Sequence, residues 1–211
     1  MVRRRLEGFQ SQEDGAAFVE MAIVITLLLI VTLGFVDFGY ALYQWNQASK
    51  AVQVGARLAV VSDPVASNMG TVVAGINAGI IPGEPSAAYS FVCDGGTSSC
   101  TNATYSAAAM TRIVAGGDGA CGPRAPGDPR PLGMCDVYSA IQPQNVRVSY
   151  TYSGLGYAGR PNGPVPTVQV SLQNLTFDFF FLGGLLGFGQ INLPPMTGTA
   201  TGEDLSSTFT N

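Results

Sequence analysis

The sequence predicts an α+β fold in which one long N-terminal helix packs on a small antiparallel β-sheet domain. Three observations support this prediction. Residues 16–36 form a largely apolar run, residues 37–61 contain no proline, and the chain beyond residue 63 carries short alternating runs between Gly- and Pro-rich loops. The first two features are typical of one continuous helix, and the third is typical of half-buried antiparallel strands.

The composition excludes several classes of function. The chain has 211 residues, of which 46% are hydrophobic and 11% charged, and its net charge is −4. A disordered polyelectrolyte needs low hydrophobicity and high net charge, and a sequence-independent nucleic-acid binder needs an excess of Lys and Arg. The chain contains no His, which excludes imidazole catalysis and the usual His-ligated zinc sites. We therefore expect no nucleic-acid partner.

The first apolar run is long enough to cross a membrane. Residues 16–36 would form a helix of about 30 Å, which matches the hydrocarbon core of a bilayer. Three consecutive arginines, residues 3–5, precede this run, whereas only Lys50 and Arg57 follow it closely. By the positive-inside rule, this asymmetry keeps the N-terminus in the cytoplasm and exports the remainder of the chain.

The residues alone leave three interpretations of this segment open. A cleaved secretory signal peptide has a shorter apolar stretch, which ends in a small-residue cleavage site that is not found here. A plain signal anchor explains the length and orientation, but it leaves Glu20, the only charged residue of the span, without a role. An ionisable residue within a span costs about 3 kcal/mol and therefore marks a function. The third interpretation gives Glu20 that function.

Glu20 is the fifth residue after Gly15, which closes a polar leader that contains the arginines. This arrangement resembles the class III signal of type IV pilins and pseudopilins. The similarity continues through G-A-A-F-V-E-M-A-I-V, then G-F-V-D-F-G-Y, then Q-A-S-K-A-V-Q-V-G-A-R-L-A. Over residues 15–59 the chain resembles the TadE-like family of minor pseudopilins from tight-adherence (Tad/Flp) pilus systems.

The resemblance implies that a prepilin peptidase removes the leader, residues 1–15, by cutting between Gly15 and Ala16 on the cytoplasmic side. The cut would free an α-amino group on Ala16 that is mostly cationic at neutral pH. In a packed filament this cation and the Glu20 carboxylate of a neighbouring helix would neutralise each other and fix the axial register between subunits. The alternative is that Glu20 simply lies at the headgroup boundary.

Residues 37–62 are expected to continue the helix into the periplasm, until Asp63 and Pro64 end it. A stripe of apolar and small residues recurs there at alternating spacings of three and four, which is typical of a helix-association seam. Its members are Phe38, Ala41, Trp45, Ala48, Val52, Gly55 and Ala59. We expect Gln44, Gln47, Lys50, Gln53 and Arg57 on the opposite face. The stripe suits packing on the protein's own domain, on other subunits, or on both along its length.

Residues 63–211 are expected to form a periplasmic, β-rich head domain. The predicted strands are residues 88–92, 146–152, 165–181 and 196–201, and residues 71–81 fit either a short helix or a strand. Two Gly- and Pro-rich loops, residues 115–132 and 153–166, separate them. The resemblance implies the same pilin-like outline.

All four cysteines, Cys93, Cys100, Cys121 and Cys135, lie in the exported part. An even number of cysteines in an oxidising compartment predicts two disulfides. Of the three possible connectivities we favour Cys93–Cys100 and Cys121–Cys135, because each closes a short Gly-rich loop. The alternative is a four-thiolate zinc site, which the absence of any C-x₂₋₄-C knuckle disfavours, so we expect no metal.

Residues 177–188 form a second apolar stretch, which is too short for a membrane span and contains Asp178. One interpretation is a buried strand that turns into a Gly-rich loop. The other is an exposed apolar loop that touches the outer leaflet or a neighbouring subunit.

The sequence predicts neither an enzyme nor a cofactor. The acidic residues of the exported part are scattered, and both G-x-x-x-x-G-K-[ST] and G-x-S-x-G are absent. Residues 154–159 fit G-x-G-x-x-G, but Arg160 and Pro161 follow them instead of a helix. The D-x-S-x-S run of metal-dependent adhesion domains is also absent.

The leading hypothesis is a minor pseudopilin of the bacterial inner membrane, with one span, a cytoplasmic N-terminus and a periplasmic head. The partners that the resemblance implies are the membrane, a prepilin peptidase, other pilins and the Tad pilus assembly machinery, without a small-molecule substrate. A second hypothesis is an uncleaved single-pass anchor that presents a periplasmic binding module. A third is an exported hydrolase that uses Asp or Glu.

Overall fold

The computed structural model describes residues 14–122, 127–161, 163–177, 179–181, 183–184, 187, 191–202 and 205–206. The chain divides into two compact units. The N-terminal unit comprises residues 1–42 and 178–191, and the head unit comprises residues 43–177 and 192–211. The leader predicted over residues 1–15 lies outside the described residues up to residue 13.

Helix α2 (Asp14–Val60) is continuous over 47 residues and contributes to both units. Its sequence is rich in Ala, Leu, Ile and Val and contains no proline, so no backbone donor is missing along its length. It ends three residues before Asp63, as the Asp63-Pro64 pair predicts. The prediction of one long helix is thus confirmed.

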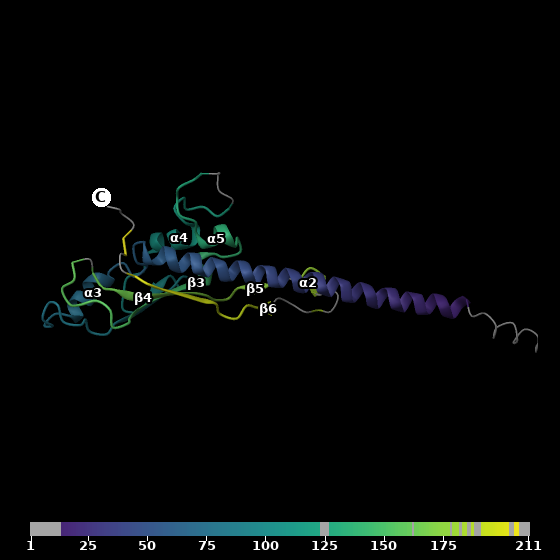
Figure 1. Ribbon diagram of the computed structural model, residues 1–211, viewed down its shortest axis with the longest axis horizontal. Coiled ribbons are helices and arrows are strands. Elements are labelled where there is room, and N and C mark those ends of the chain that lie inside the picture. The colour runs from purple at the N-terminus through teal and green to yellow at the C-terminus, as the bar shows by residue number, and fades with distance from the viewer. Residues whose placement is uncertain are drawn as a thin grey trace, which may run out of the picture. The chain divides into compact units, whose positions relative to one another are not determined.

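The head unit contains a five-stranded antiparallel sheet in the order β2-β1-β3-β4-β7. Figure 1 shows two of its neighbouring strands, β3 and β4. Its strands are β1 (Ser90–Asp94), β2 (Ser99–Cys100), β3 (Val146–Tyr152), β4 (Pro166–Leu172) and β7 (Thr197–Thr201). A two-stranded sheet pairs β5 (Thr176–Phe177) with β6 (Ile191–Asn192). One helix with a small antiparallel sheet is the α+β fold that the sequence predicts.

The strand predictions differ from the structure mainly at their ends. Residues 146–152 form β3 as predicted, whereas β1 begins two residues later than the predicted strand 88–92. The strand predicted over residues 165–181 stops at Leu172, and β5 is a separate strand. Asn174 has a positive φ of 54°, a turn conformation that interrupts the extended chain between them.

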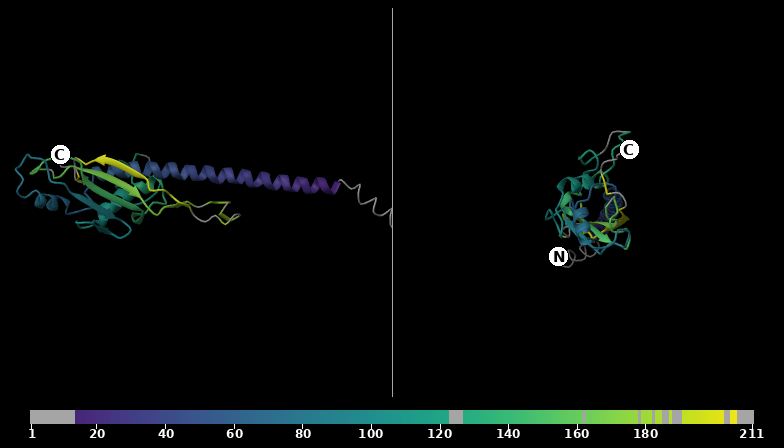
Figure 2. Two further views of the ribbon diagram at one scale, coloured as in Figure 1. Left: turned by 90° about the horizontal axis from the view of Figure 1, so that it is seen from below. Right: turned by 90° about the vertical axis from the view of Figure 1, so that its left-hand side faces the viewer.

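One face of the sheet forms the core together with the last part of α2. Cys93, Val148, Val170 and Gly198 lie opposite one another across β1, β3, β4 and β7. At the end of this row, a Cβ on Gly198 would lie 2.9 Å from Cγ1 of Val52, so β7 approaches the helix closely because residue 198 has no side chain. Figure 2 shows β7, in yellow, at the edge of the sheet.

The helix buries a wider stripe in the head unit than the sequence predicts. Ala48, Ala51, Val52, Ala56 and Ala59 are all at most 3% exposed. The placement of Gln44 on the solvent face is wrong, because this side chain is 6% exposed. The Tyr138 hydroxyl donates a hydrogen bond to Oε1 of Gln44 over 3.3 Å, which compensates for the burial of the amide.

Short helices complete the head unit: α3 (Met69–Ile76), α4 (Ala107–Ala115), α5 (Met134–Val137) and the 3₁₀ turn η1 (Pro143–Asn145). Helix α3 shows that the helical alternative for residues 71–81 was the better one up to Ile76. Helix α4 was not predicted. The Ser106 hydroxyl accepts a hydrogen bond from the Ala109 N–H at its N-terminus, and Gly116 ends it with a φ of 74°.

Both favoured disulfides are present. Cys93 and Cys100 face each other across β1 and β2, and Cys121 is bonded to Cys135 of α5. The Cys100 sulfur also lies 3.8 Å from the Val65 carbonyl oxygen. The first disulfide therefore fastens a short edge strand to the sheet, and the second fastens a loop to the core.

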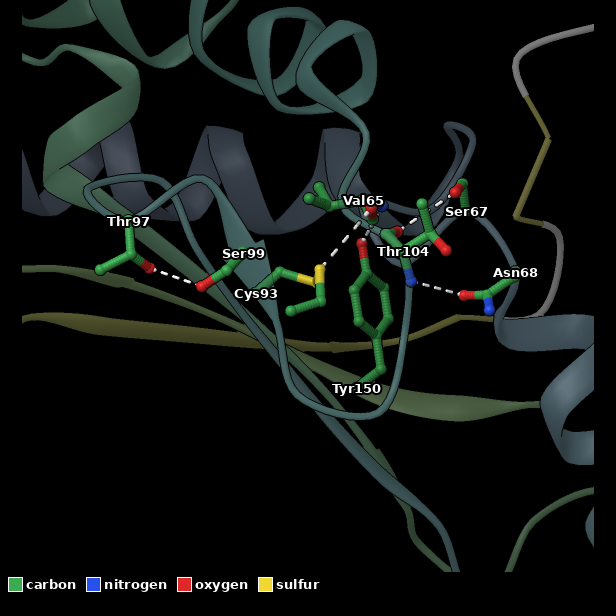
Figure 3. The surroundings of a disulfide bond; sticks show 9 residues. Val65, Ser67, Asn68, Cys93, Thr97, Ser99, Thr104 and Tyr150 are labelled. Carbon is green, nitrogen blue, oxygen red and sulfur yellow. Dashed lines mark hydrogen bonds between the residues drawn. A yellow bond between two sulfur atoms is a disulfide. The ribbon is translucent and has the colours of Figure 1, made fainter.

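Tyr150 connects the sheet to the chain that leaves α2. Its hydroxyl is fully buried and accepts a 2.9 Å hydrogen bond from the Val65 N–H (Figure 3). The Tyr89 hydroxyl, also buried, has no hydrogen-bond partner among the described residues. Burial and the nearby Tyr152 raise the pKa of Tyr89 to about 12, and burial also raises the pKa of Tyr150.

These two tyrosines make a matched pair of substitutions. We expect Tyr150→Phe to lower the free energy of unfolding by ~1–3 kcal/mol, because it leaves the Val65 N–H buried and unpaired. Tyr89→Phe should leave it unchanged or raise it by up to ~1 kcal/mol, because it removes a buried hydroxyl that has no partner. Denaturant unfolding of the full chain in detergent would show the difference, and equal losses in both variants would contradict this assignment.

Candidate functional site

Residues 16–29 of α2 carry an apolar surface that no other described residue covers. Large side chains are exposed all around the helix, among them Phe18 at 79% and Leu28 at 61%, and Phe35 further along is 73% exposed. The helix over residues 15–60 is long and apolar enough to cross a membrane, and its most apolar window is not buried at all. A surface of this size requires a lipid or protein environment.

Gly15, Ala16 and Glu20 occupy the first turns of this helix. All three are exposed, and a Cβ on Gly15 would meet no atom within 4 Å. Ala16 and Glu20 are four residues apart, so they lie on one face of the helix, one turn from each other. Glu20 is the only ionisable residue between Gly15 and Val36. An amino group created at Ala16 would thus lie about one helical turn from this carboxylate along the helix axis.

The predicted association stripe divides into two parts. Ala48, Val52, Gly55 and Ala59 are buried in the core of the head unit itself. Gly55 lies against α5, where a Cβ would be 2.5 Å from the Met134 sulfur. The earlier members of the stripe are accessible to solvent: Phe38 is 61% exposed, Trp45 is 38% exposed, and Ala41 is partly exposed. Of the seven members of the stripe, only these three are exposed fully or in part.

Asp37 is a residue of this region that our sequence analysis missed. It follows the apolar run directly and is 1% exposed. Its Oδ1 accepts a 3.1 Å hydrogen bond from the Phe180 N–H, and its Oδ2 accepts a 3.0 Å hydrogen bond from the Phe181 N–H. The Phe180 ring lies 4.7 Å from the ring of Tyr40, measured between centroids. The signal available in the sequence was a carboxylate at the end of a membrane-length run.

The second apolar stretch, residues 177–188, is described only in part. Phe177 is buried, whereas Phe180 is 65% exposed and Phe181 is 43% exposed. Residues 178, 182, 185, 186 and 188 lie outside the described residues. The exposure of the two rings favours the interpretation as an exposed apolar loop over that as a buried strand.

A family model described as TadE-like protein matches residues 15–57. This segment is therefore similar to the TadE-like family, and we call it the TadE-like segment. The TadE-like segment begins at Gly15 and includes Ala16, Glu20, Asp37 and the stripe as far as Gly55. It corresponds to α2 without its last turn. No curated protein and no solved structure matches the chain. The similarity therefore concerns the helix, and the head unit beyond residue 60 lies outside it.

Outside the TadE-like segment, several acidic residues of the head unit accept hydrogen bonds from its turns and strands, namely Asp94, Asp118, Asp128 and Asp136. Asp94 lies 2.6 Å from Nη2 of Arg147 and 2.9 Å from Nε2 of Gln173. Burial raises the pKa of Asp94, but hydrogen bonds from Gln173, Arg147 and Gly96 outweigh this effect and lower it overall. Such a carboxylate is held ionised, which suits a structural role.

A cavity of about 310 Å³ lies in the head unit between α3 and the loop around residue 160. The polar side chains that line the cavity make hydrogen bonds within the loops that form it. Asn77 donates to the Ser86 hydroxyl and accepts from the Ala87 N–H, and Arg160 donates to the Gly163 carbonyl. No cluster of His, Cys, Asp or Glu suited to a metal ion occurs within the described part of the chain.

Proposed function

We propose that this protein is a minor pseudopilin of a Tad-type (Flp) pilus, which is cut between Gly15 and Ala16 by a prepilin peptidase and takes part in pilus biogenesis. The observation that carries the proposal is the match of residues 15–57 to the TadE-like family, which starts at the glycine of the predicted cleavage site. The family is pilus-related and structural, so the proposal assigns no catalysis to the chain.

The exposed surface of α2 supports this function. Its apolar side chains need lipid before assembly and other helices after it, and a pilin-like helix meets both environments in turn. The exposed part of the stripe, Phe38, Ala41 and Trp45, is then the segment that packs on other pilins. The buried part, from Ala48 to Ala59, holds the head onto its own helix.

The proposed location is the bacterial inner membrane, with the N-terminus in the cytoplasm and the head in the periplasm. The three consecutive arginines of the leader support this orientation. The two disulfides in the head support an oxidising compartment for it. The partners are the membrane, the prepilin peptidase, other pilins or pseudopilins, and the Tad assembly machinery.

The direct test is the N-terminal residue of the protein purified from membranes of its native host. Ala16 as the first residue would support class III processing and the pilus-related function. An intact Met1 or Val2 terminus, in cells with an active peptidase, would contradict the proposal. The chain would then be an uncleaved single-pass anchor that presents a periplasmic binding module.

The role of Glu20 can be tested separately from cleavage. We expect Glu20→Ala to reduce the number of assembled pili at least about tenfold, because the new amino group at Ala16 would lack a carboxylate partner in the packed filament. The variant should still be cut after Gly15 and inserted in the membrane. Thr26→Ala, which changes another exposed polar residue of the same helix, is the control. Normal piliation with Glu20→Ala would refute the charge pairing.

A further inference from the structure

Asp37 holds a turn of the chain against α2 at the point where the apolar run ends. Two consecutive backbone N–H groups, of Phe180 and Phe181, donate to the two oxygens of one carboxylate at 3.1 and 3.0 Å. Ionised acceptors make hydrogen bonds that are stronger than neutral ones. Asp37 is 1% exposed, so the residue is buried where it accepts these bonds. A buried charge of this kind is retained where it satisfies specific donors.

The position of Asp37 along the helix sets its depth in a membrane. If residues 16–36 fill the hydrocarbon core, which takes about 20 residues, then Asp37 lies at the interface on the side of the head. Irregular backbone is not found exposed to lipid unless its N–H and C=O groups are satisfied. The bidentate bond to Asp37 satisfies the N–H groups of Phe180 and Phe181, so this turn fits the environment of the interface.

The side chains of the turn point to a lipid environment. Phe180 and Phe181 are 65% and 43% exposed, although the backbone that carries them is fastened down. Phe35 and Phe38, on the adjoining turns of the helix, are 73% and 61% exposed, and Tyr40 packs on Phe180. Aromatic rings gather at membrane–water interfaces, where an apolar ring and a nearby polar group are both accommodated.

We propose that the Phe180–Phe181 turn is a second membrane contact of this protein, docked on α2 by Asp37. The two rings enter the boundary between headgroups and acyl chains, in the leaflet opposite the N-terminus. Lipid is the favoured occupant because the rings extend the surface of the helix that is itself apolar and uncovered. This inference rests on the membrane-spanning helix of the proposed function.

Tryptophan fluorescence in vesicles tests the depth of the turn. Trp45 is the only tryptophan of the chain, so a Trp45→Phe variant has no tryptophan fluorescence. In this background we would introduce Phe180→Trp, Leu28→Trp in the span, or Leu155→Trp on an exposed loop of the head. The full chains would be reconstituted in phosphatidylethanolamine–phosphatidylglycerol vesicles, with and without lipids brominated on the upper part of the acyl chains.

We expect blue-shifted emission from Phe180→Trp and a loss of its intensity with brominated lipid, as for Leu28→Trp, but no such loss for Leu155→Trp. Adding Asp37→Asn to Phe180→Trp should shift the emission to the red, because the amide has one acceptor oxygen for two donors. Glu84→Gln, which neutralises an exposed acid of the head unit, should not.

Two outcomes would overturn the inference, provided that brominated lipid still quenches the fluorescence of Leu28→Trp. One is quenching of Phe180→Trp by aqueous acrylamide alone, which would place the turn in water. The other is protection from both quenchers that is lost on dilution into more lipid, which would make a second copy of the chain the occupant. If Leu28→Trp itself escapes the brominated lipid, the spanning helix of the proposed function fails, and this inference fails with it.

Discussion

A Gly15→Leu variant is expected to remain uncut in cells that contain an active prepilin peptidase. Under the proposed function, the peptidase acts between Gly15 and Ala16. A Cβ on Gly15 would meet no atom of the described residues within 4 Å, so the fold itself tolerates a side chain there. A branched side chain at this position would obstruct the peptidase site, so we expect complete loss of processing. Intact-mass measurement of the protein from membranes would show the leader still attached, and pili should be absent.

Gly8→Leu is the matched control, because Gly8 is another glycine of the same leader. We expect this variant to be cut and assembled normally. Unchanged processing of Gly15→Leu would show that the chain is not a substrate with a class III signal. Equal loss in both variants would indicate that the leader as a whole, and not the residue at the cut, is recognised.

The largest expected effect on stability comes from Gly95→Ala. Gly95 follows β1, and its N–H donates to the Val146 carbonyl at 2.9 Å. A Cβ there would lie 1.8 Å from the Pro143 carbonyl oxygen, which belongs to the backbone of η1 and has no rotamer to change. We expect a loss of at least ~3 kcal/mol in the free energy of unfolding, because η1 or the end of β1 must move.

Gly70→Ala provides the comparison for this substitution. Gly70 lies in α3, and a Cβ there would meet no atom within 4 Å. Alanine is the better helix former, so the variant should be as stable as the wild type or slightly more stable. Thermal unfolding of the full chains in detergent would compare the two. A Gly95→Ala protein as stable as Gly70→Ala would contradict the close approach of η1 to Gly95.

The association stripe shows what sequence periodicity can predict about a helix and what it cannot. A spacing of three and four identifies a face of a helix, but it does not identify what covers that face. The structure buries Ala48 and Val52 in the protein's own core and leaves Phe38 exposed. The burial of Gln44 could not be predicted from the sequence either, because its hydrogen-bond partner Tyr138 is 94 residues away along the chain.

Local signals were sufficient for several elements. The apolar run, the absence of proline and the Asp63-Pro64 pair determine α2, because helix formation and termination depend on neighbouring residues. The alternation over residues 146–152 determines β3 and the side it buries. The short separations between Cys93 and Cys100 and between Cys121 and Cys135 were enough to favour the pairs that the structure contains.

Tertiary structure alone decided which distant groups meet. Helix α4 is only nine residues long, and its stability comes from its buried face rather than from a strong local pattern. The bond between Tyr150 and Val65 and the one between Asp37 and Phe180 each join residues far apart along the chain. The sequence by itself therefore determined the TadE-like helix and the disulfides. Only the folded chain determined which part of that helix is buried in the head and which carboxylate holds the aromatic turn, because both depend on contacts between distant segments.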